Sequence, residues 1–230
     1  MSRIPITLPV MPPLTLRKLG TATFTTMLAV VVVGCHKAKP DPAAPPPQLH
    51  PLSGIVGQAL IVAPVQALRV AAELAWTGLP RSAAVTMGLD SAIAVVLKER
   101  VANTEWAYFD ALAKSYANNP TYATDPRALA VNPLRAASLK VEQRLPEPIA
   151  SQLRTMIALQ SGRLVLIPVE LRFDRTPAGL GRPVVRLVLI DPRSSVVRWI
   201  GEVIGTDSPG FPSAYTALSA DRIADLFVAK

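Results

Sequence analysis

The chain has a single cysteine, Cys35, and this limits how it can fold more than any other feature does. No intrachain disulfide is possible, so a folded part must be held together by its apolar core alone. Hydrophobic residues make up 50% of the 230 residues, enough for a sizeable core. The two histidines, His36 and His50, lie early in the chain. We therefore expect the folded part to contain neither a histidine nor a thiol.

That expectation excludes several kinds of site from the folded part. Ser-His-Asp and Cys-His catalysis both need a histidine, and zinc sites are commonly built on histidine and cysteine. Carboxylate, lysine and serine–lysine chemistry stay open. Gly179-Leu180-Gly181 is too short for a phosphate-binding loop and reads as a turn. We predict a protein that is not an enzyme and needs no cofactor or metal.

Cys35 follows a short apolar run with a positive flank. Arg17 and Lys18 precede about 13 mostly apolar residues, 21–33, and Gly34 comes directly before the cysteine. This layout is typical of a secretory signal peptide. A transmembrane helix is the alternative, but it needs roughly 20 apolar residues. The layout resembles the bacterial lipobox, so we predict that Cys35 is lipidated, with acyl chains such as palmitate on its sulfur and amino group.

This interpretation divides the chain into three parts. Residues 1–34 are predicted to be the lipoprotein signal peptide, with Met1 and Met11 both open as the start. Residues 35–56 are the lipidated cysteine and a proline-rich tether, and residues 57–230 are a single globular domain. His36, rather than aspartate, follows the cysteine, which favours the outer membrane with the domain facing the periplasm.

The net charge is +8, but the arginines are scattered and no basic run exceeds two residues. Binding to nucleic acid is therefore not indicated, and export argues against it. A basic exported protein can instead lie against acidic envelope polymers or lipid headgroups.

Apolar periodicity predicts the order of elements. We expect a strand at 57–65, an ambiguous segment at 65–80 and two helices, one capped by Asp90 and one ending at Pro120. Further elements are expected in the second half: a helix at 149–160, strands at 163–173, 184–190 and 196–204, and a C-terminal helix. Pro168 marks an edge or a bulge. The first strand can join the later ones only through a helical crossover, so the fold class is α+β, with helices packed on a mixed, mostly antiparallel sheet.

Three segments resemble the TolB amino-terminal-like fold group. Residues 59–64 resemble its opening strand, residues 163–168 its second strand, and residues 187–201 its hairpin, in which an acidic residue ends one strand and an aromatic and a glycine follow on the return. The group includes the curli-secretion lipoprotein and the lipoprotein activators of penicillin-binding proteins. The resemblance covers about residues 57–228 and implies an exported, lipid-anchored protein that is not catalytic.

The candidate binding residues are aromatic and basic. Glu105, Trp106, Tyr108 and Phe109 form an aromatic cluster beside a carboxylate, which is either a binding patch or a buried helix start. We take Trp106 and Tyr108, with Arg127 and Arg135 in the polar segment that follows, as a surface for an envelope assembly or synthase partner, or for another copy of the chain. A glycan or small-molecule site near Trp106 and a carboxylate-dependent envelope hydrolase are the alternatives.

Overall fold

The structure is a computed structural model, and it describes residues 50–228. The predicted signal peptide, Cys35 and most of the predicted tether lie outside these residues. Within the described range, no helix is both long enough and apolar enough to cross a membrane.

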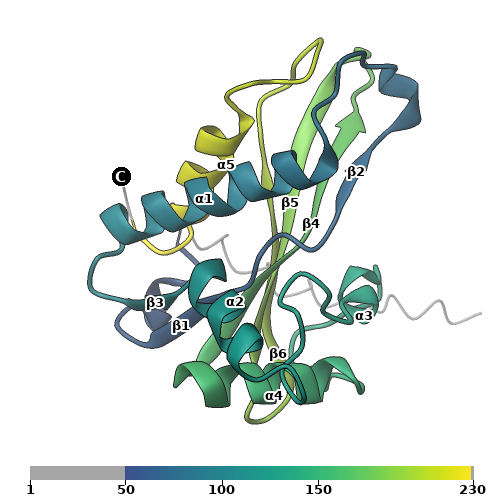
Figure 1. Ribbon diagram of the computed structural model, residues 1–230. Helices are drawn as coiled ribbons and strands as arrows, with labels where there is room; N and C mark the ends of the chain where they lie inside the picture. Colours follow the sequence, from purple (N-terminus) through teal and green to yellow (C-terminus); the bar gives the residue numbers. More distant parts are fainter. Residues whose placement is uncertain (1–49, 229–230) are drawn as a thin grey trace, which may run out of the picture. The chain divides into compact units, whose positions relative to one another are not determined.

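One mixed sheet organises the described part of the chain (Figure 1). Its strands are β1 (Ala59–Val62), β2 (Leu68–Val70), β3 (Glu105–Ala107), β4 (Leu164–Arg175), β5 (Gly181–Asp191) and β6 (Val196–Ile204). The strand order is β3-β1-β4-β5-β6, and β2 also pairs with β4. The short pairs β1–β3, β1–β4 and β2–β4 are parallel, whereas the long pairs β4–β5 and β5–β6 are antiparallel.

Helices cover both faces of this sheet (Figure 1). They are α1 (Ser82–Arg100), α2 (Phe109–Asn118), α3 (Asn132–Arg135), α4 (Ile149–Gln160) and α5 (Tyr215–Ala224), with short 3-10 turns at Ser53–Ile55 and Ala72–Leu74. Helices α1 and α5 lie on one face, and α2 and α4 lie on the other. The predicted α+β class with helices on a mixed sheet is confirmed.

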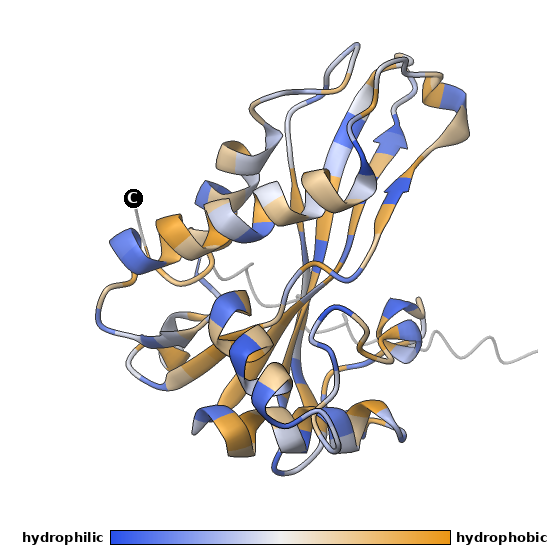
Figure 2. Ribbon diagram, in the orientation of Figure 1, coloured by the Kyte–Doolittle hydropathy of each residue, from blue (hydrophilic) through white to orange (hydrophobic). Residues whose placement is uncertain are grey.

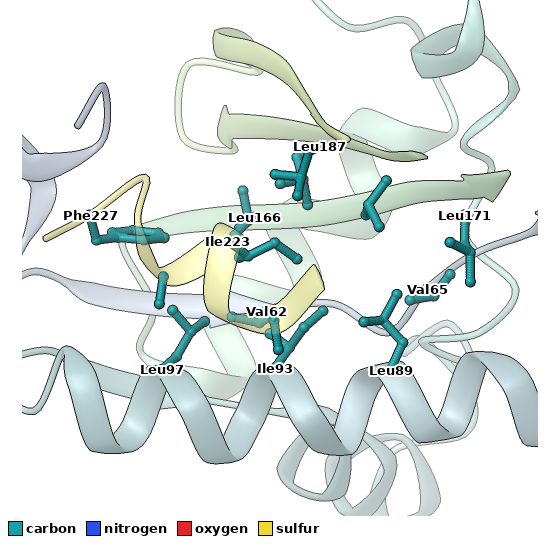
Figure 3. Close-up of a cluster of buried hydrophobic side chains, with 14 of the residues drawn as sticks. Val62, Val65, Leu89, Ile93, Leu97, Leu166, Leu171, Leu187, Ile223 and Phe227 are labelled. Carbon is teal, nitrogen blue, oxygen red and sulfur yellow. The ribbon is translucent and has the colours of Figure 1, made fainter. Parts of the chain in front are cut away.

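The alternation of side chains along the strands builds two cores. On one face, Leu89, Ile93 and Leu97 of α1 point toward the strands, where they meet β1 and β4 and the end of the chain at Phe227 (Figure 3). On the other face, Ile61 and its neighbours pack against α2, α3 and α4. Strands β1, β4 and β5 contain long apolar runs because both of their faces are buried (Figure 2).

Two features of the antiparallel hairpins agree with what their proline and aspartate residues indicate. The register of β4 on β5 shifts between Pro168 and Glu170, so the predicted bulge at Pro168 is confirmed. At the turn after β5, Oδ1 of Asp191 accepts the N–H of Arg193 at 3.0 Å. Asp191 therefore caps the turn, as its position before Pro192 predicts.

Two local predictions are wrong. Asp90 is not a helix N-cap, because α1 begins at Ser82 and Asp90 lies in its middle. Val85 and Leu89 extend the buried stripe of the helix toward its start. The expected helix start around Trp106 is instead the edge strand β3, which pairs in parallel with β1.

The residues just before the predicted domain border pack on the fold. Leu52 is only 2% exposed, and its N–H donates to the carbonyl oxygen of Leu226 at 2.8 Å. Nδ1 of His50 lies 2.6 Å from the carbonyl oxygen of Asp225. A histidine therefore contacts the folded part, contrary to expectation, and burial begins before residue 57.

Candidate functional site

The connections that follow β1 and β3 cross opposite faces of the sheet. The link from β1 to β3 runs through α1 on one face, and the link from β3 to β4 runs through α2 and α4 on the other. Open α/β sheets hold ligands at the carboxyl ends of strands at such a switch point. A pocket of about 150 Å³ lies there. Its lining residues are Val62, Ala63, Pro64, Met87, Asp90, Ser91, Ile93, Ala94, Tyr108, Phe109, Asp110 and Arg127.

An ion pair forms one wall of this pocket. Oδ2 of Asp90 lies 2.9 Å from Nη2 of Arg127, and the Asp90 side chain is only 10% exposed. Oδ1 of Asp90 accepts the N–H of Val65 at 2.7 Å. Burial raises the pKa of Asp90, and the Val65 hydrogen bond and the Arg127 charge lower it in part.

Contacts of the Arg127 side chain and of its neighbouring residues fix the position of Arg127. The guanidinium carbon lies 4.1 Å from the ring centroid of Phe109, a cation–π contact. The side-chain amide of Gln66 donates to the carbonyl oxygen of Pro126 at 2.8 Å and accepts the N–H of Leu129 at 3.3 Å. These bonds hold the loop of Arg127 against the chain that leaves β1.

Tyr108 provides the polar group without a partner. Its hydroxyl is buried and has no hydrogen-bond partner among the described residues. Burial raises the pKa of this phenol, so it stays protonated and able to donate. Buried polar atoms are nearly always hydrogen-bonded. Tyr108 is also one of the residues that line the pocket, so the site contains a buried donor without a partner in the part of the chain that the structure describes.

The other predicted site residues lie elsewhere. The indole N–H of Trp106 donates to the carbonyl oxygen of Val101 at 3.2 Å, and its ring meets Phe227 edge-on at 5.4 Å. Trp106 stacks on Tyr108 but does not line the pocket. Arg135 is exposed at the end of α3 and also lies outside the lining. Cys35 is outside the described residues.

The structure thus places Tyr108 and Arg127 in the lining of one pocket. It also places Asp90 in this lining and Gln66 beside it, and the sequence analysis assigned neither residue to a site. Asp90 was interpreted as a helix cap, and Gln66 carried no motif. The signal that could have found Asp90 is a lone carboxylate in a helix that is otherwise uncharged from Ser82 to Leu97. Over residues 50–228, no group of three or more His, Cys, Asp and Glu side chains could hold a metal ion.

The outer side of α1 beside the pocket is apolar and exposed. Met87 lines the pocket and is 51% exposed, and Val95 on the same helix is 55% exposed. Figure 2 shows that much of α1 has the colours of apolar or weakly polar residues. We call the pocket together with Met87 and Val95 the α1 surface.

No protein-family model matches the chain, and no curated protein matches it by sequence. Several solved structures are similar to it. The C-terminal domain of LpoB from Salmonella enterica matches with a TM-score of 0.39 and 13% identity over 68% of this chain and 93% of its own. The PelC dodecamer from Paraburkholderia phytofirmans matches with a TM-score of 0.36 and 16% identity over 76% of this chain and 90% of its own.

Lipoprotein GNA1162 from Neisseria meningitidis matches with a TM-score of 0.37 and 13% identity, over 67% of this chain and 84% of its own. All three similarities are distant, with identities of 13–16% and TM-scores of 0.36–0.39.

Proposed function

We propose that this protein is an exported, lipid-anchored and non-catalytic binding protein, and that it holds an envelope protein partner on the α1 surface. Cys35, after its apolar run and glycine, supports the anchor. His36 after it supports the outer membrane, with the domain facing the periplasm. The partner is a component of an envelope assembly or a synthase, and a second copy of the chain is the other outcome to test.

The observation that carries the proposal is that Tyr108 lines the pocket and has a buried hydroxyl without a hydrogen-bond partner within residues 50–228. An acceptor from a partner would satisfy this donor, while the Asp90–Arg127 pair beside it offers one charge of each sign. A desolvated pocket of this kind suits a single anchoring side chain of a partner protein.

The size of the pocket favours a protein side chain over a small molecule or a glycan. Small-molecule pockets commonly measure about 300–1,000 Å³, and this one measures about 150 Å³. Trp106, the ring that a glycan site would use, is outside the lining.

The surroundings fit a protein interface. The exposed Met87 and Val95 lie on α1, which has a single charged residue, Asp90, between Ser82 and Leu97. Interface cores are depleted of charge and enriched in methionine and aromatic residues. A partner covering this surface would bury apolar area that is now in contact with water.

The proposal is tested by site-specific photo-crosslinking in intact envelopes. A crosslinking side chain replaces Met87 or Val95, and the matched control replaces Ala178, which is exposed in the turn between β4 and β5. We expect the same adduct from both α1 positions and none from the control. Adducts at all three positions, or none at α1, would contradict the proposal. An adduct with twice the mass of the chain identifies a second copy as the partner.

A further inference from the structure

A second hollow, of about 320 Å³, lies where α4 begins beside the turn between β5 and β6. Its lining residues are Arg144, Leu145, Glu147, Ala150, Arg154, Arg193, Ser194 and Ser195. None of them belongs to the α1 surface. We call this hollow the arginine pocket, because three of its lining side chains are guanidinium groups.

One of the three arginines is already paired. Nη2 of Arg154 lies 2.6 Å from Oε1 of Glu147, and Nη1 donates to Oγ of Ser195 at 2.8 Å. The hydrogen bond from Arg154, together with two from Ser151, lowers the pKa of Glu147 to about 2. Glu147 is therefore ionised at neutral pH, and the pair is electrically neutral.

The other two arginines have no such partner. Within residues 50–228, no ion pair or hydrogen bond involves the side chains of Arg144 and Arg193. Three positive charges against one negative charge leave the pocket with a net charge of +2. Nearby like charges repel one another, so a bound anion would relieve this repulsion.

The backbone that carries these side chains is fixed. Arg144 forms a β-bridge with Val196, and the N–H of Leu145 donates to the carbonyl oxygen of Ser195 at 2.8 Å. The N–H of Arg193 is held by Asp191 at 3.0 Å. Strand pairing and a capped turn therefore fix the backbone of Arg144 and Arg193, from which the two guanidinium groups extend.

We propose that the arginine pocket binds a phosphate group, a function separate from partner binding on the α1 surface. Guanidinium groups match phosphate oxygens in paired, charge-assisted hydrogen bonds. A phosphate monoester carries about −1.5 to −2 charges at pH 7 and three acceptor oxygens. It would neutralise the net charge of the pocket, whereas one carboxylate would neutralise only half of it.

The experiment titrates the full chain, made as Cys35→Ser so that no acyl group is attached, with inorganic phosphate in a phosphate-free buffer of low ionic strength. Low ionic strength matters because salt screens such contacts. We expect saturable binding that weakens about tenfold or more in Arg144→Gln and in Arg193→Gln, since a hydrogen bond to a charged group contributes about that factor. Arg175→Gln is the matched control, because it removes an exposed arginine at the far end of β4. Unchanged melting temperatures establish that the variants are folded.

A second variant moves the affinity in the opposite direction. Glu147→Gln removes the only carboxylate of the lining and releases Arg154, so phosphate should bind several-fold more tightly. No saturable binding by the chain with an unaltered pocket, or equal binding by all four variants, would overturn the proposal.

A vesicle arm distinguishes a lipid phosphate from a free one. Vesicles of phosphatidylcholine with phosphatidic acid are compared with phosphatidylcholine alone. Binding to the first only, lost in Arg144→Gln, assigns the phosphate to a lipid headgroup. Binding of free phosphate without vesicle binding assigns it to a soluble or polymer-borne group.

Discussion

Oδ2 of Asp90 lies 2.9 Å from Nη2 of Arg127, and this contact joins the middle of α1 to the loop that follows α2. The same carboxylate accepts the N–H of Val65, in the segment that follows β1. Three segments that are distant in the sequence therefore meet at one side chain. This arrangement both shapes the pocket and makes the two residues interdependent for stability.

Charge reversal separates Arg127 from Arg135. The sequence analysis takes both as part of one binding surface, but Arg127 is paired with a mostly buried carboxylate. Arg127→Glu should lower the free energy of unfolding by about 2 kcal/mol, because it leaves Asp90 facing another carboxylate. Arg135→Glu should change it by less than about 0.5 kcal/mol. Urea unfolding checks both, and equal stabilities would show that the ion pair contributes nothing.

Removal of the Tyr108 hydroxyl should affect binding rather than folding. Because the hydroxyl is buried without a partner, Tyr108→Phe should leave the free energy of unfolding unchanged or raise it by about 1 kcal/mol. Capture of the crosslinked partner should weaken in the same variant. A clear loss of stability in chemical denaturation would instead mean that the hydroxyl has a partner within the folded chain.

The pH dependence of stability should carry a contribution from Asp90. Its pKa is raised by burial, so the contribution is fully present below the ordinary value of 3.8 and is lost as the pH rises through the raised pKa. Asp90→Asn keeps an oxygen for the N–H of Val65 and removes the titration. Between pH 7 and pH 4, the unaltered chain should gain stability relative to Asp90→Asn, and a constant or opposite difference in urea unfolding would refute this assignment.

The border of the folded unit is testable by truncation. The sequence predicts that residues 57–230 fold alone, whereas Leu52 lies in the core at 2% exposure. A chain from residue 57 should therefore be less stable than one from residue 46 by about 2–4 kcal/mol, close to the cost of deleting a buried leucine side chain. Leu52→Ala in the longer chain should reproduce most of this loss in thermal melts followed by circular dichroism. Equal stabilities would place the border at residue 57.

The elements that the sequence predicts well are those whose apolar runs are buried on both faces. Strands β1, β4 and β5 are of this kind. Strand β3 was missed because it has three residues, begins with the exposed Glu105 and owes its conformation to pairing with β1. Such pairing depends on partners far along the chain, so no local pattern indicates it.

Trp199 shows the same limit. Its side chain lies on the edge strand β6, where it packs against the core beneath α1 and α5 but stays half-buried. Its ring lies across Gly201, where an added Cβ would come within 2.2 Å. The spacing of tryptophan and glycine along the strand allows this contact, although sequence alone does not choose it over burial.

Some residues of the candidate site could be predicted from the sequence, and others could not. Tyr108 and Arg127 were expected to share a surface, because an aromatic cluster and a basic residue of the next polar segment both suit a partner. Asp90 was assigned to a helix start since aspartate is common there. Its role depends on where α1 begins, and that is set by Val85 and Leu89 packing on the sheet.

The most direct test of the account is the dissociation constant for the crosslinked partner, measured with one altered residue on the α1 surface and one matched residue away from it. Met87 is 51% exposed beside the pocket, and Val141, which does not line it, is 50% exposed. Met87→Glu should weaken binding at least about tenfold, because a charge would be buried against the partner. Val141→Glu should leave binding unchanged. Equal binding by both variants, or a loss confined to Val141→Glu, would contradict the claim that the partner lies on the α1 surface.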